Sequence, residues 1–220
     1  MSRAIYTSMS GAQAAWRQLE VLANNMANGG TQGFRESRVS FETAGADMAQ
    51  VGGTRVSTGD GEMQTDDVPT HVALRGDGFF ALADGSFTRD GEFRLDDEGQ
   101  LVSREGIAVL GDGGPIQVQP GEVLAIGEDG TVRGSASGEV GRLSVMSLSG
   151  ASPLGGARWS GKGTALDQPT VVQGALEGSN VDLMRGMVEM IEASRFFEAQ
   201  QKAMQTADDM QQRINRIGGS

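Results

Sequence analysis

The stretch AIYTSMSGAQAAWRQLEVLANNMAN, residues 4–28, organises the rest of the chain. Its apolar residues are spaced alternately by four and three positions, and it contains no Pro and a single Gly. This 3.5-residue repeat predicts a helix that keeps one apolar stripe toward a partner helix. At about 1.5 Å per residue, the helix would be roughly 36 Å long. The stripe consists of Ile5, Met9, Ala12, Trp16, Leu19, Ala23 and Met26.

A second long helix is predicted at the other end of the chain, from the segment 176–182 to about Ile217. Ser179 and Asp182 have the spacing of a capping box, and Asn180 is an alternative N-cap. The apolar residues of this helix again follow steps of three and four. The stripe consists of Phe196, Ala203, Ala207, Met210, Ile214 and Ile217, and Phe197 and Met204 form a flanking row.

Charge and glycine separate the ends of the chain from its middle. The net charge is -11, yet residues 1–28 hold two bases and one acid, and residues 181–217 hold six acids and five bases. The segment between them therefore carries the acidic excess. It also holds all five Pro and all but four of the 34 Gly. An acidic chain argues against binding to nucleic acid or to an anionic membrane surface, since both require basic patches.

The middle of the chain divides into two parts. Residues 72–175 contain short apolar runs separated by Asp-Gly turns, which predicts an antiparallel β domain. Residues 35–71 have too few apolar residues for a core, so we expect an extended arm packed on other subunits or on the two helices; a flexible linker is the alternative. The predicted fold class is α+β, with paired N- and C-terminal coiled-coil-like helices (1–34 and 176–220) and an inserted antiparallel β domain.

The sequence contains no convincing catalytic, cofactor or metal site. There is no Cys, which excludes disulfides and Cys-based zinc sites. Residues 156–162 have the Gly-x4-Gly-Lys spacing of a P-loop, but Gly163 replaces the Mg²⁺-binding Ser or Thr and no apolar helix follows. His71 is a lone histidine, and the acidic run 96–98 lacks the ligand spacing of an EF-hand.

No segment of the sequence predicts membrane insertion or cleavage. No run approaches the roughly 18 apolar residues of a transmembrane helix. The N-terminal segment also lacks the continuous apolar region of a secretory signal peptide.

The two apolar stripes allow two interpretations. The helices could pack on one another within a monomer, or they could pack between copies in an assembly. A straight C-terminal helix would reach about 55 Å, longer than a small β domain is wide, so much of its stripe would stay exposed in a monomer. This favours an assembly. A β-rich binding module that is merely dimerised by its helices remains an alternative of a different class.

Several motifs occur together along almost the whole chain and resemble the signatures of the flagellar axial protein family, which forms rods and hooks. The resemblance implies a structural, non-enzymatic subunit of the bacterial flagellar basal-body rod, in which the helices form the inner tube and the β domain faces outward. The motifs are Ala4–Gly11, Leu22–Asn28, Thr31–Arg35, Val72–Phe80, Phe87–Phe93, Gly174–Val181, Met187–Ile191 and Arg195–Glu198.

The resemblance also implies partners and a location. It implies export by the flagellar type III apparatus without cleavage, followed by polymerisation in the periplasm with copies of itself and with other rod proteins. It implies no direct insertion into the membrane. The segments Arg3–Thr7 and Leu176–Val181 are most similar to the proximal-rod branch of the family, and a distal-rod or hook-type protein is the alternative.

We expect the assembly interface to include the two stripes and the elbow, which is the segment from Asn28 to Phe34 that follows the first helix. The asparagines at that helix end could bond neighbouring backbones or simply cap the helix. The expected interface residues are Ile5, Met9, Trp16, Leu19, Ala23, Asn24, Asn25, Met26, Asn28, Gly33, Phe34, Asn180, Val181, Ile191, Phe196, Phe197, Met204, Met210, Ile214 and Ile217.

Overall fold

The computed structural model describes residues 2–43, 49–57, 59–119 and 121–218. The chain forms two compact units, each built from segments that are distant in sequence. Unit 1 comprises Met1–Ala27, Ser37–Arg55 and Asp182–Ser220. Unit 2 comprises Asn28–Glu36 and Val56–Val181. The structure confirms the α+β class, with a helix at each end of the chain and antiparallel strands between them.

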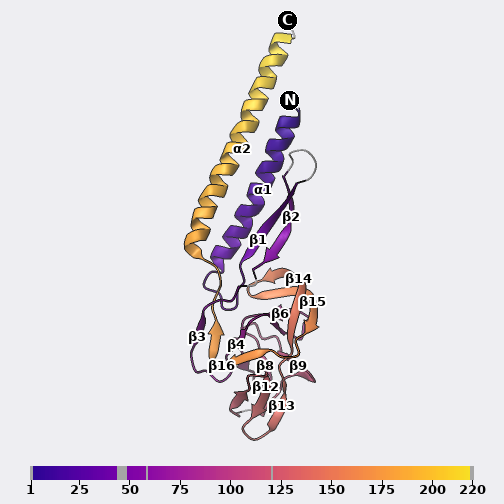
Figure 1. Cartoon of the computed structure of the whole chain (residues 1–220), viewed down its shortest axis with the longest axis vertical. Helices are drawn as coiled ribbons and strands as arrows, with labels where there is room; N and C mark the ends of the chain where they lie inside the picture. The colour runs from indigo at the N-terminus through magenta and orange to yellow at the C-terminus, as the bar shows by residue number, and fades with distance from the viewer. Residues whose placement is uncertain (1, 44–48, 58, 120, 219–220) are drawn as a thin grey trace. The chain divides into compact units, whose positions relative to one another are not determined.

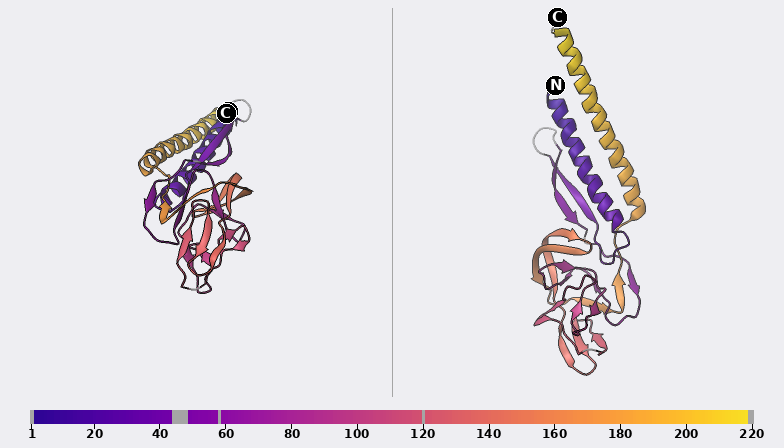
Figure 2. Two further views of the ribbon diagram at one scale, coloured as in Figure 1. Left: turned by 60° about the horizontal axis from the view of Figure 1, so that its bottom comes forward. Right: turned by 180° about the vertical axis from the view of Figure 1, so that it is seen from behind.

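Unit 1 contains the two helices and one pair of strands. Helix α1 spans Ser2–Ala27 and helix α2 spans Leu183–Gly218. Strands β1 (Ser37–Thr43) and β2 (Ala49–Val56) pair as a two-stranded sheet. The helices run side by side, with β1 next to α1 (Figures 1 and 2). Neither helix carries, among its described residues, a stretch long and apolar enough to cross a membrane.

Helix α2 begins later than the capping box in the sequence predicts. Its first turn is capped by Asp182, whose Oδ1 accepts a hydrogen bond from the Arg185 backbone N–H at 3.1 Å. Ser179 instead accepts from the Val181 N–H, which closes a local turn before the helix. Asp, Ser and Asn are all strong N-caps, so the sequence alone does not decide which of the three positions is used.

Strands β1 and β2 pair within the segment for which the sequence predicts an extended arm. Asn25 of α1 supplies a partner that the sequence pattern does not reveal. Its side-chain amide donates to the Ser37 carbonyl at 2.8 Å and accepts from the Ser37 N–H at 2.9 Å. Both residues are buried. This two-way bond fixes the first residue of β1 to the last turns of α1.

Unit 2 is an assembly of short antiparallel strands around one apolar core. Strands β5 (Phe79–Ala81), β6 (Phe87–Thr88), β14 (Val145–Gly155) and β15 (Arg158–Ala165) close into a small barrel. The other strands pair as β11–β12–β13, β16–β4, β17–β3, β7–β8 and β10–β9. Their bounds are β3 Met63–Thr65, β4 Val72–Arg75, β7 Arg94–Leu95, β8 Leu101–Val102, β9 Leu110–Gly111, β10 Gly114–Pro115, β11 Leu124–Ile126, β12 Thr131–Gly134, β13 Gly138–Arg142, β16 Thr170–Gln173 and β17 Ala175–Glu177.

Asp-Gly turns connect the strands where the sequence predicts hairpins. Asp112 and Gly113 are the two residues between β9 and β10, and Asp129 and Gly130 lie in the turn between β11 and β12. The core includes Val72, Leu74, Phe80, Leu82, Phe93, Leu101, Val109, Val132 and Val171. The P-loop-like stretch 156–162 forms the turn between β14 and β15 and the start of β15, so it has a strand-turn-strand structure.

Replacing Asn25 with Ala should loosen the start of β1. The change removes both hydrogen bonds to Ser37 and leaves a buried backbone N–H and C=O without that partner, at a cost of about 1–3 kcal/mol. Hydrogen exchange followed by mass spectrometry should show faster exchange for the peptide that contains Ser37. Gln13→Ala, on the exposed side of the same helix, is the matched control and should leave this peptide unchanged. Equal protection in both variants would contradict the assigned role of Asn25.

Candidate assembly interface

The two terminal helices pack against each other in antiparallel order. Residue numbers rise on one helix as they fall on the other at three points of contact, one of which is an aromatic pair with ring centroids 6.0 Å apart. Small residues at two of these points allow the helix backbones to approach closely. The three pairs are Gly11 with Gln200, Trp16 with Phe197, and Met26 with Gly186.

One row of α2 forms this contact, and it keeps heptad spacing. The row is buried or half-buried and consists of Gly186, Met190, Ala193, Phe197, Gln200, Met204 and Ala207. Of the expected interface residues, Phe197 and Met204 therefore lie toward α1. Phe196 and Met210 lie outside this row and are each more than half exposed. The expected stripe thus separates into residues used within the chain and residues left uncovered.

Helix α1 leaves three large apolar side chains uncovered, which we call the α1 face. They are Tyr6, Met9 and Trp16, with exposed fractions of 62%, 48% and 61%. The side of α1 that contacts β1 buries Asn25, and Ala14 and Val21 share that side by their spacing. Partners within the chain therefore cover two sides of α1. Tyr6 and Met9 remain exposed, as does most of Trp16, whose ring also contacts Phe197.

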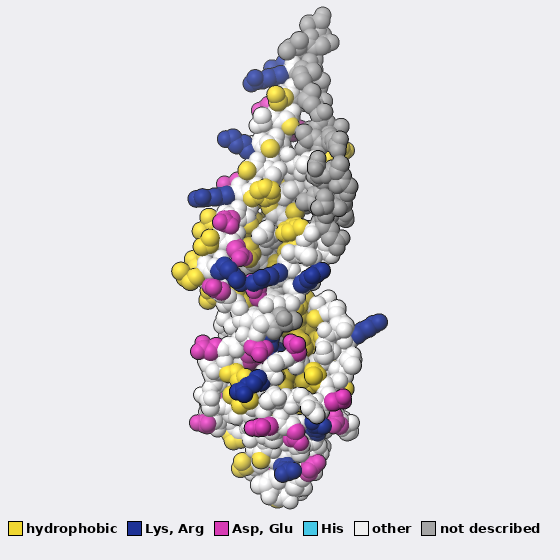
Figure 3. All heavy atoms as spheres, in the orientation of Figure 1, with side chains coloured by type: hydrophobic (Ala, Val, Ile, Leu, Met, Phe, Trp, Pro, Cys, Tyr) yellow, Lys and Arg dark blue, Asp and Glu magenta, His cyan; other side chains and the backbone are white. Residues whose placement is uncertain are grey.

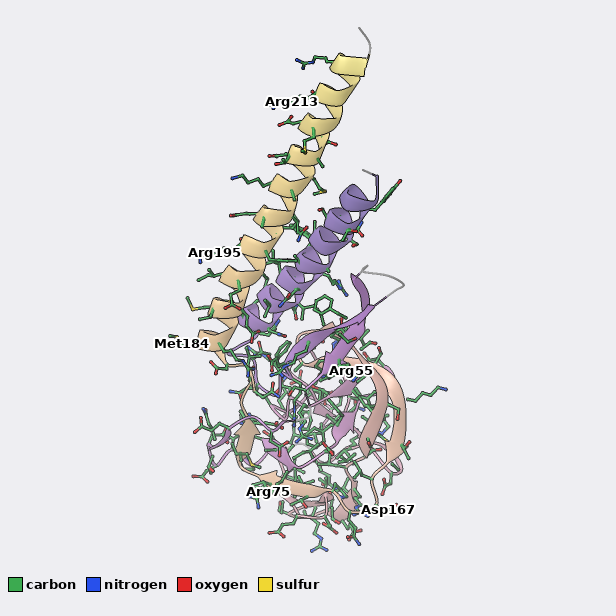
Figure 4. All side chains as sticks on the ribbon, turned by 45° about the horizontal axis from the view of Figure 1, so that its top comes forward. Arg55, Arg75, Asp167, Met184, Arg195 and Arg213 are labelled. Carbon is green, nitrogen blue, oxygen red and sulfur yellow. The ribbon has the colours of Figure 1, made fainter. Side chains whose placement is uncertain are left out.

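The first turns of α2 expose a larger apolar surface, which we call the α2 face. Its members are Leu183, Met184, Met187, Val188 and Ile191. Met184 is 76% exposed, and the other four are between 45% and 56% exposed. Hydrophobic side chains gather over this part of the helix in Figure 3, and Figure 4 shows Met184 on the side of α2 away from α1. Only Ile191 of this face is among the expected interface residues. The spacing 184, 187, 188 and 191 is the signal that could have identified the others.

The elbow that follows α1 is built into unit 2. Gly33 has a φ of 64°, and a Cβ there would come within 2.3 Å of the backbone of Arg89 and Asp90. Its N–H donates to the Glu177 carbonyl at 2.7 Å. Phe34 is almost fully buried, with its ring centroid 6.4 Å from that of Trp159. Gly33 and Phe34, both expected at the assembly interface, are thus used inside the subunit.

A buried ion cluster lies directly beneath this elbow. The Glu177 carboxylate is 2.8 Å from the Arg35 guanidinium and 2.5 Å from that of Arg89, and all three side chains are at most 4% exposed. Asp60, which is 42% exposed, completes the cluster at 3.0 Å from Arg35. Burial lowers the pKa of the Arg89 guanidinium, and the Glu177 carboxylate opposes that shift. Two buried cations therefore share one buried anion.

Arg89 also donates hydrogen bonds to the backbone of the segment 74–78. Its guanidinium donates to three backbone carbonyls, at 2.5 to 2.9 Å. A buried guanidinium that makes several such bonds restrains the backbone segment that supplies the carbonyls. The acceptors are the carbonyls of Leu74, Gly76 and Gly78.

Asn180 ties the two ends of unit 2 together. Its side-chain oxygen accepts from the Glu36 N–H at 2.6 Å, and its amide donates to the Gly59 carbonyl at 2.7 Å. The Glu36 carbonyl in turn accepts from the Ser57 N–H at 2.8 Å. The three places where the chain passes between unit 1 and unit 2, near Glu36, Ser57 and Asn180, are therefore joined by hydrogen bonds. Sequence reasoning expected Asn180 at an interface and overlooked Arg35, Arg89 and Glu177, because isolated charges in a polar chain carry no signal of burial.

The other expected interface residues lie in varied surroundings. Leu19, Met26, Asn28 and Val181 are half-buried, whereas Ala23 and Asn24 are exposed. The Asn28 carbonyl accepts from the Thr31 N–H, which closes the turn after α1. Ile5, Ile214 and Ile217 belong to the helices, but their side chains are outside the described residues.

Unit 2 also contains a cavity of about 380 Å³. Arg158, one of its charged lining residues, lies 2.8 Å from Glu105 and 3.2 Å from Asp84. Arg104, another, lies 3.6 Å from Glu92. Each of these basic groups therefore has a carboxylate beside it, which opposes the binding of an anionic ligand. The lining residues are Thr31, Leu82, Thr88, Asp90, Ser103, Arg104, Glu105, Gly156, Ala157 and Arg158.

The chain thus consists of two terminal helices, each with an uncovered apolar face, and an antiparallel β unit inserted between them in the sequence. Comparison with known families gives three matches in chain order. Residues 5–35 match the family "Flagella basal body rod protein", residues 73–134 match "Flagellar hook protein FlgE/F/G D1 domain", and residues 172–217 match "Flagellar basal body rod FlgEFG protein C-terminal".

Full-length relatives carry two names within this group. The flagellar basal-body rod protein FlgF of Escherichia coli (strain K12) is 33% identical over 99% of this chain and 98% of its own length. FlgF of Mesorhizobium japonicum is 32% identical over 99% of both chains. FlgG of Borreliella burgdorferi is 32% identical over 96% of both. The chain belongs to the flagellar basal-body rod protein family, in agreement with the resemblance found in its motifs.

Replacing Glu177 with Gln should strongly destabilise unit 2. The substitution keeps the shape of the side chain but leaves Arg35 and Arg89 buried without their shared anion, at a cost of about 3–5 kcal/mol. The test is urea denaturation followed by tryptophan fluorescence in a Trp16→Phe background. The fluorescence then reports on unit 2 alone, because the remaining Trp, Trp159, is fully buried in it.

The matched control is Glu139→Gln. Glu139 and Arg133 form an exposed pair, 3.7 Å apart and each 65% exposed. Such surface pairs contribute little to stability, so the urea midpoint should not move measurably. A Glu177→Gln protein as stable as this control would show that the buried cluster is not required for the fold.

Proposed function

We propose that this chain is a structural subunit of the bacterial flagellar rod that polymerises through its terminal helices and helps to transmit torque to the hook. The observation that carries the proposal is the pair of uncovered apolar faces on α1 and α2. Burying one large apolar side chain contributes about 1.5–3 kcal/mol. Eight such side chains on the two faces are exposed in the monomer. Burying them against neighbouring subunits would stabilise the assembly.

The partners we propose are copies of this chain and other flagellar rod proteins. Coiled-coil-like packing of helices from neighbouring subunits would cover the α1 and α2 faces, while unit 2, which carries most of the acidic side chains, would stay solvated. The chain has no assigned catalytic role in this proposal. Its relatives are named as rod proteins, which supports a basal-body location.

For delivery, we propose export by the flagellar type III apparatus without a cleaved signal peptide, followed by assembly in the periplasm without direct membrane insertion. The N-terminal residues support this, because Ser2–Ala27 form one continuous amphipathic helix. Residues that pack in the mature subunit, such as Ala12 and Ala15, would be lost with a cleaved leader.

Within the rod we propose a position of the FlgF type, in the proximal rod. The segments Arg3–Thr7 and Leu176–Val181 support this position, and relatives named FlgF match the chain along almost its entire length. A distal, FlgG-type position is the second candidate, because relatives with that name are similar to nearly the same degree.

Charged substitutions on the α1 face should block incorporation into the rod. In a flagellated bacterium that lacks its own copy, a Tyr6→Asp/Met9→Asp variant should be exported but be absent from purified basal bodies, and the cells should be non-motile. Burying two carboxylates against apolar neighbours costs several kcal/mol, enough to lower incorporation by about 100-fold or more.

The matched control is Tyr6→Phe/Met9→Leu, which keeps the face apolar and should restore motility. Immunoblots of the periplasmic fraction and of the basal bodies would separate export from assembly. Normal incorporation of the aspartate variant would exclude the α1 face from the subunit contacts.

A further inference from the structure

We propose that three segments of unit 2, each next to a place where the chain passes to or from unit 1, form a load-sharing clamp. In this clamp a mechanical pull on one crossing is carried by all three segments. They are residues 33–36, 59–62 and 177–180, called the first, second and third segments. This inference rests on the proposed function, because transmitted torque is what would load the crossings.

Backbone hydrogen bonds join the third segment to each of the other two. In the first segment, the Gly33 N–H donates to the Glu177 carbonyl at 2.7 Å. In the second, the Glu62 carbonyl accepts from the Gly178 N–H at 2.8 Å. The second contact is close, since a Cβ on Gly61 would come within 2.0 Å of the Gly178 carbonyl oxygen. A larger residue at Gly61 would therefore require the backbone to shift.

Side chains complete the connections between the segments. Asn180 of the third segment reaches both others, because its amide oxygen accepts from the Glu36 N–H and its amide nitrogen donates to the Gly59 carbonyl. Arg35 joins the first segment to the second. Its guanidinium donates to the Gly59 carbonyl and, at 3.0 Å, to the Asp60 carboxylate. Each segment is thus bonded to both of the others.

This closed set of bonds determines how a pull is carried. If one segment were held by successive bonds to a single neighbour, a pull on it would break those bonds one after another. In the clamp, displacing one segment strains its bonds to both others at once. The bonds of Arg35 are also charge-assisted, which makes them about twice as strong as neutral ones. A pull on one crossing therefore meets the resistance of all three segments.

Pulling single molecules at the second crossing tests the clamp directly. The chain has no Cys, so Arg55→Cys and Glu139→Cys give two unique attachment points for DNA handles. Both residues are exposed, and they lie in β2 of unit 1 and in β13 of unit 2. With the clamp intact, the traces should show no lengthening between residues 56 and 62 before unit 2 opens.

Asn180→Ala should release the second crossing early. The change removes the side-chain bonds from the third segment to the other two, so residues 56–62 should detach at a lower force than opens unit 2. These seven residues would lengthen the molecule by up to about 25 Å, because an extended chain spans at most about 3.6 Å per residue. Asp60→Asn weakens the link to Arg35 at a partly exposed position. It should give the same early step, and it serves as the test if Asn180→Ala does not fold.

The matched control is Gln173→Ala. The Gln173 amide also joins separate segments of unit 2, since it accepts from the Ile126 N–H and donates to the carbonyls of Pro69 and Leu124, at 2.7 to 3.1 Å. It lies outside the clamp, so its loss should lower the force that opens unit 2 without adding the early step. Traces of Asn180→Ala that match those of Gln173→Ala would overturn the proposal.

Swimming cells separate this inference from the proposed function. If the wild-type chain is absent from basal bodies, the rod function itself is wrong, whatever the pulling traces show. If both variants are present in equal amount, Asn180→Ala cells should lose more speed than Gln173→Ala cells when the medium is made viscous, because the torque on the rod rises. An equal loss of speed would mean that the rod function stands and that the clamp carries no load in it.

Discussion

The buried carboxylate of Glu177 is the interaction on which unit 2 depends. It neutralises Arg35, which follows the elbow after α1, and Arg89, which follows β6. Moving charges out of water costs several kcal/mol each, and that cost is offset only when all three groups are in place. Because these residues come from the start, the middle and the end of the chain, unit 2 cannot reach its final structure until its most distant segments have met. The cluster therefore forms only when segments far apart in sequence are in contact, in addition to the local pairing of strands.

The two units differ in the size of the side chains that they bury. Among the described residues, every one of the largest fully buried side chains, Trp159, Phe34, Phe80 and Phe93 among them, belongs to unit 2. In unit 1, the contact between the helices includes the small residues Gly11 and Gly186, and several large apolar side chains of the two faces stay half or more exposed. The interior of unit 1 therefore contributes far less hydrophobic stabilisation than its sequence could supply.

Periodicity and turn chemistry were enough to predict the α+β class, the two terminal helices and the antiparallel hairpins. The contacting row on α2 was harder to identify, because Phe196 and Phe197 are adjacent and both apolar, and the row that faces α1 includes the polar Gln200. The β1–β2 pair was missed because its anchor is a side chain on α1, Asn25. The ion cluster was missed because its partners are 88 and 142 residues apart in sequence, and a charged residue gives no local sign of burial. Local patterns determine elements, whereas long-range polar contacts appear only in the folded chain.

These features together explain why one chain combines a self-sufficient unit with an incomplete one. Unit 2 has its own apolar core and pairs Arg35 and Arg89 with a carboxylate of its own. Unit 1 has a long helix pair, a marginal two-stranded sheet and two uncovered apolar faces, and isolated helices with few buried contacts are only marginally stable in water. Neighbouring subunits would supply the missing half of its core. In the rod proposed above, assembly would therefore complete the packing of unit 1 as well as join one subunit to the next.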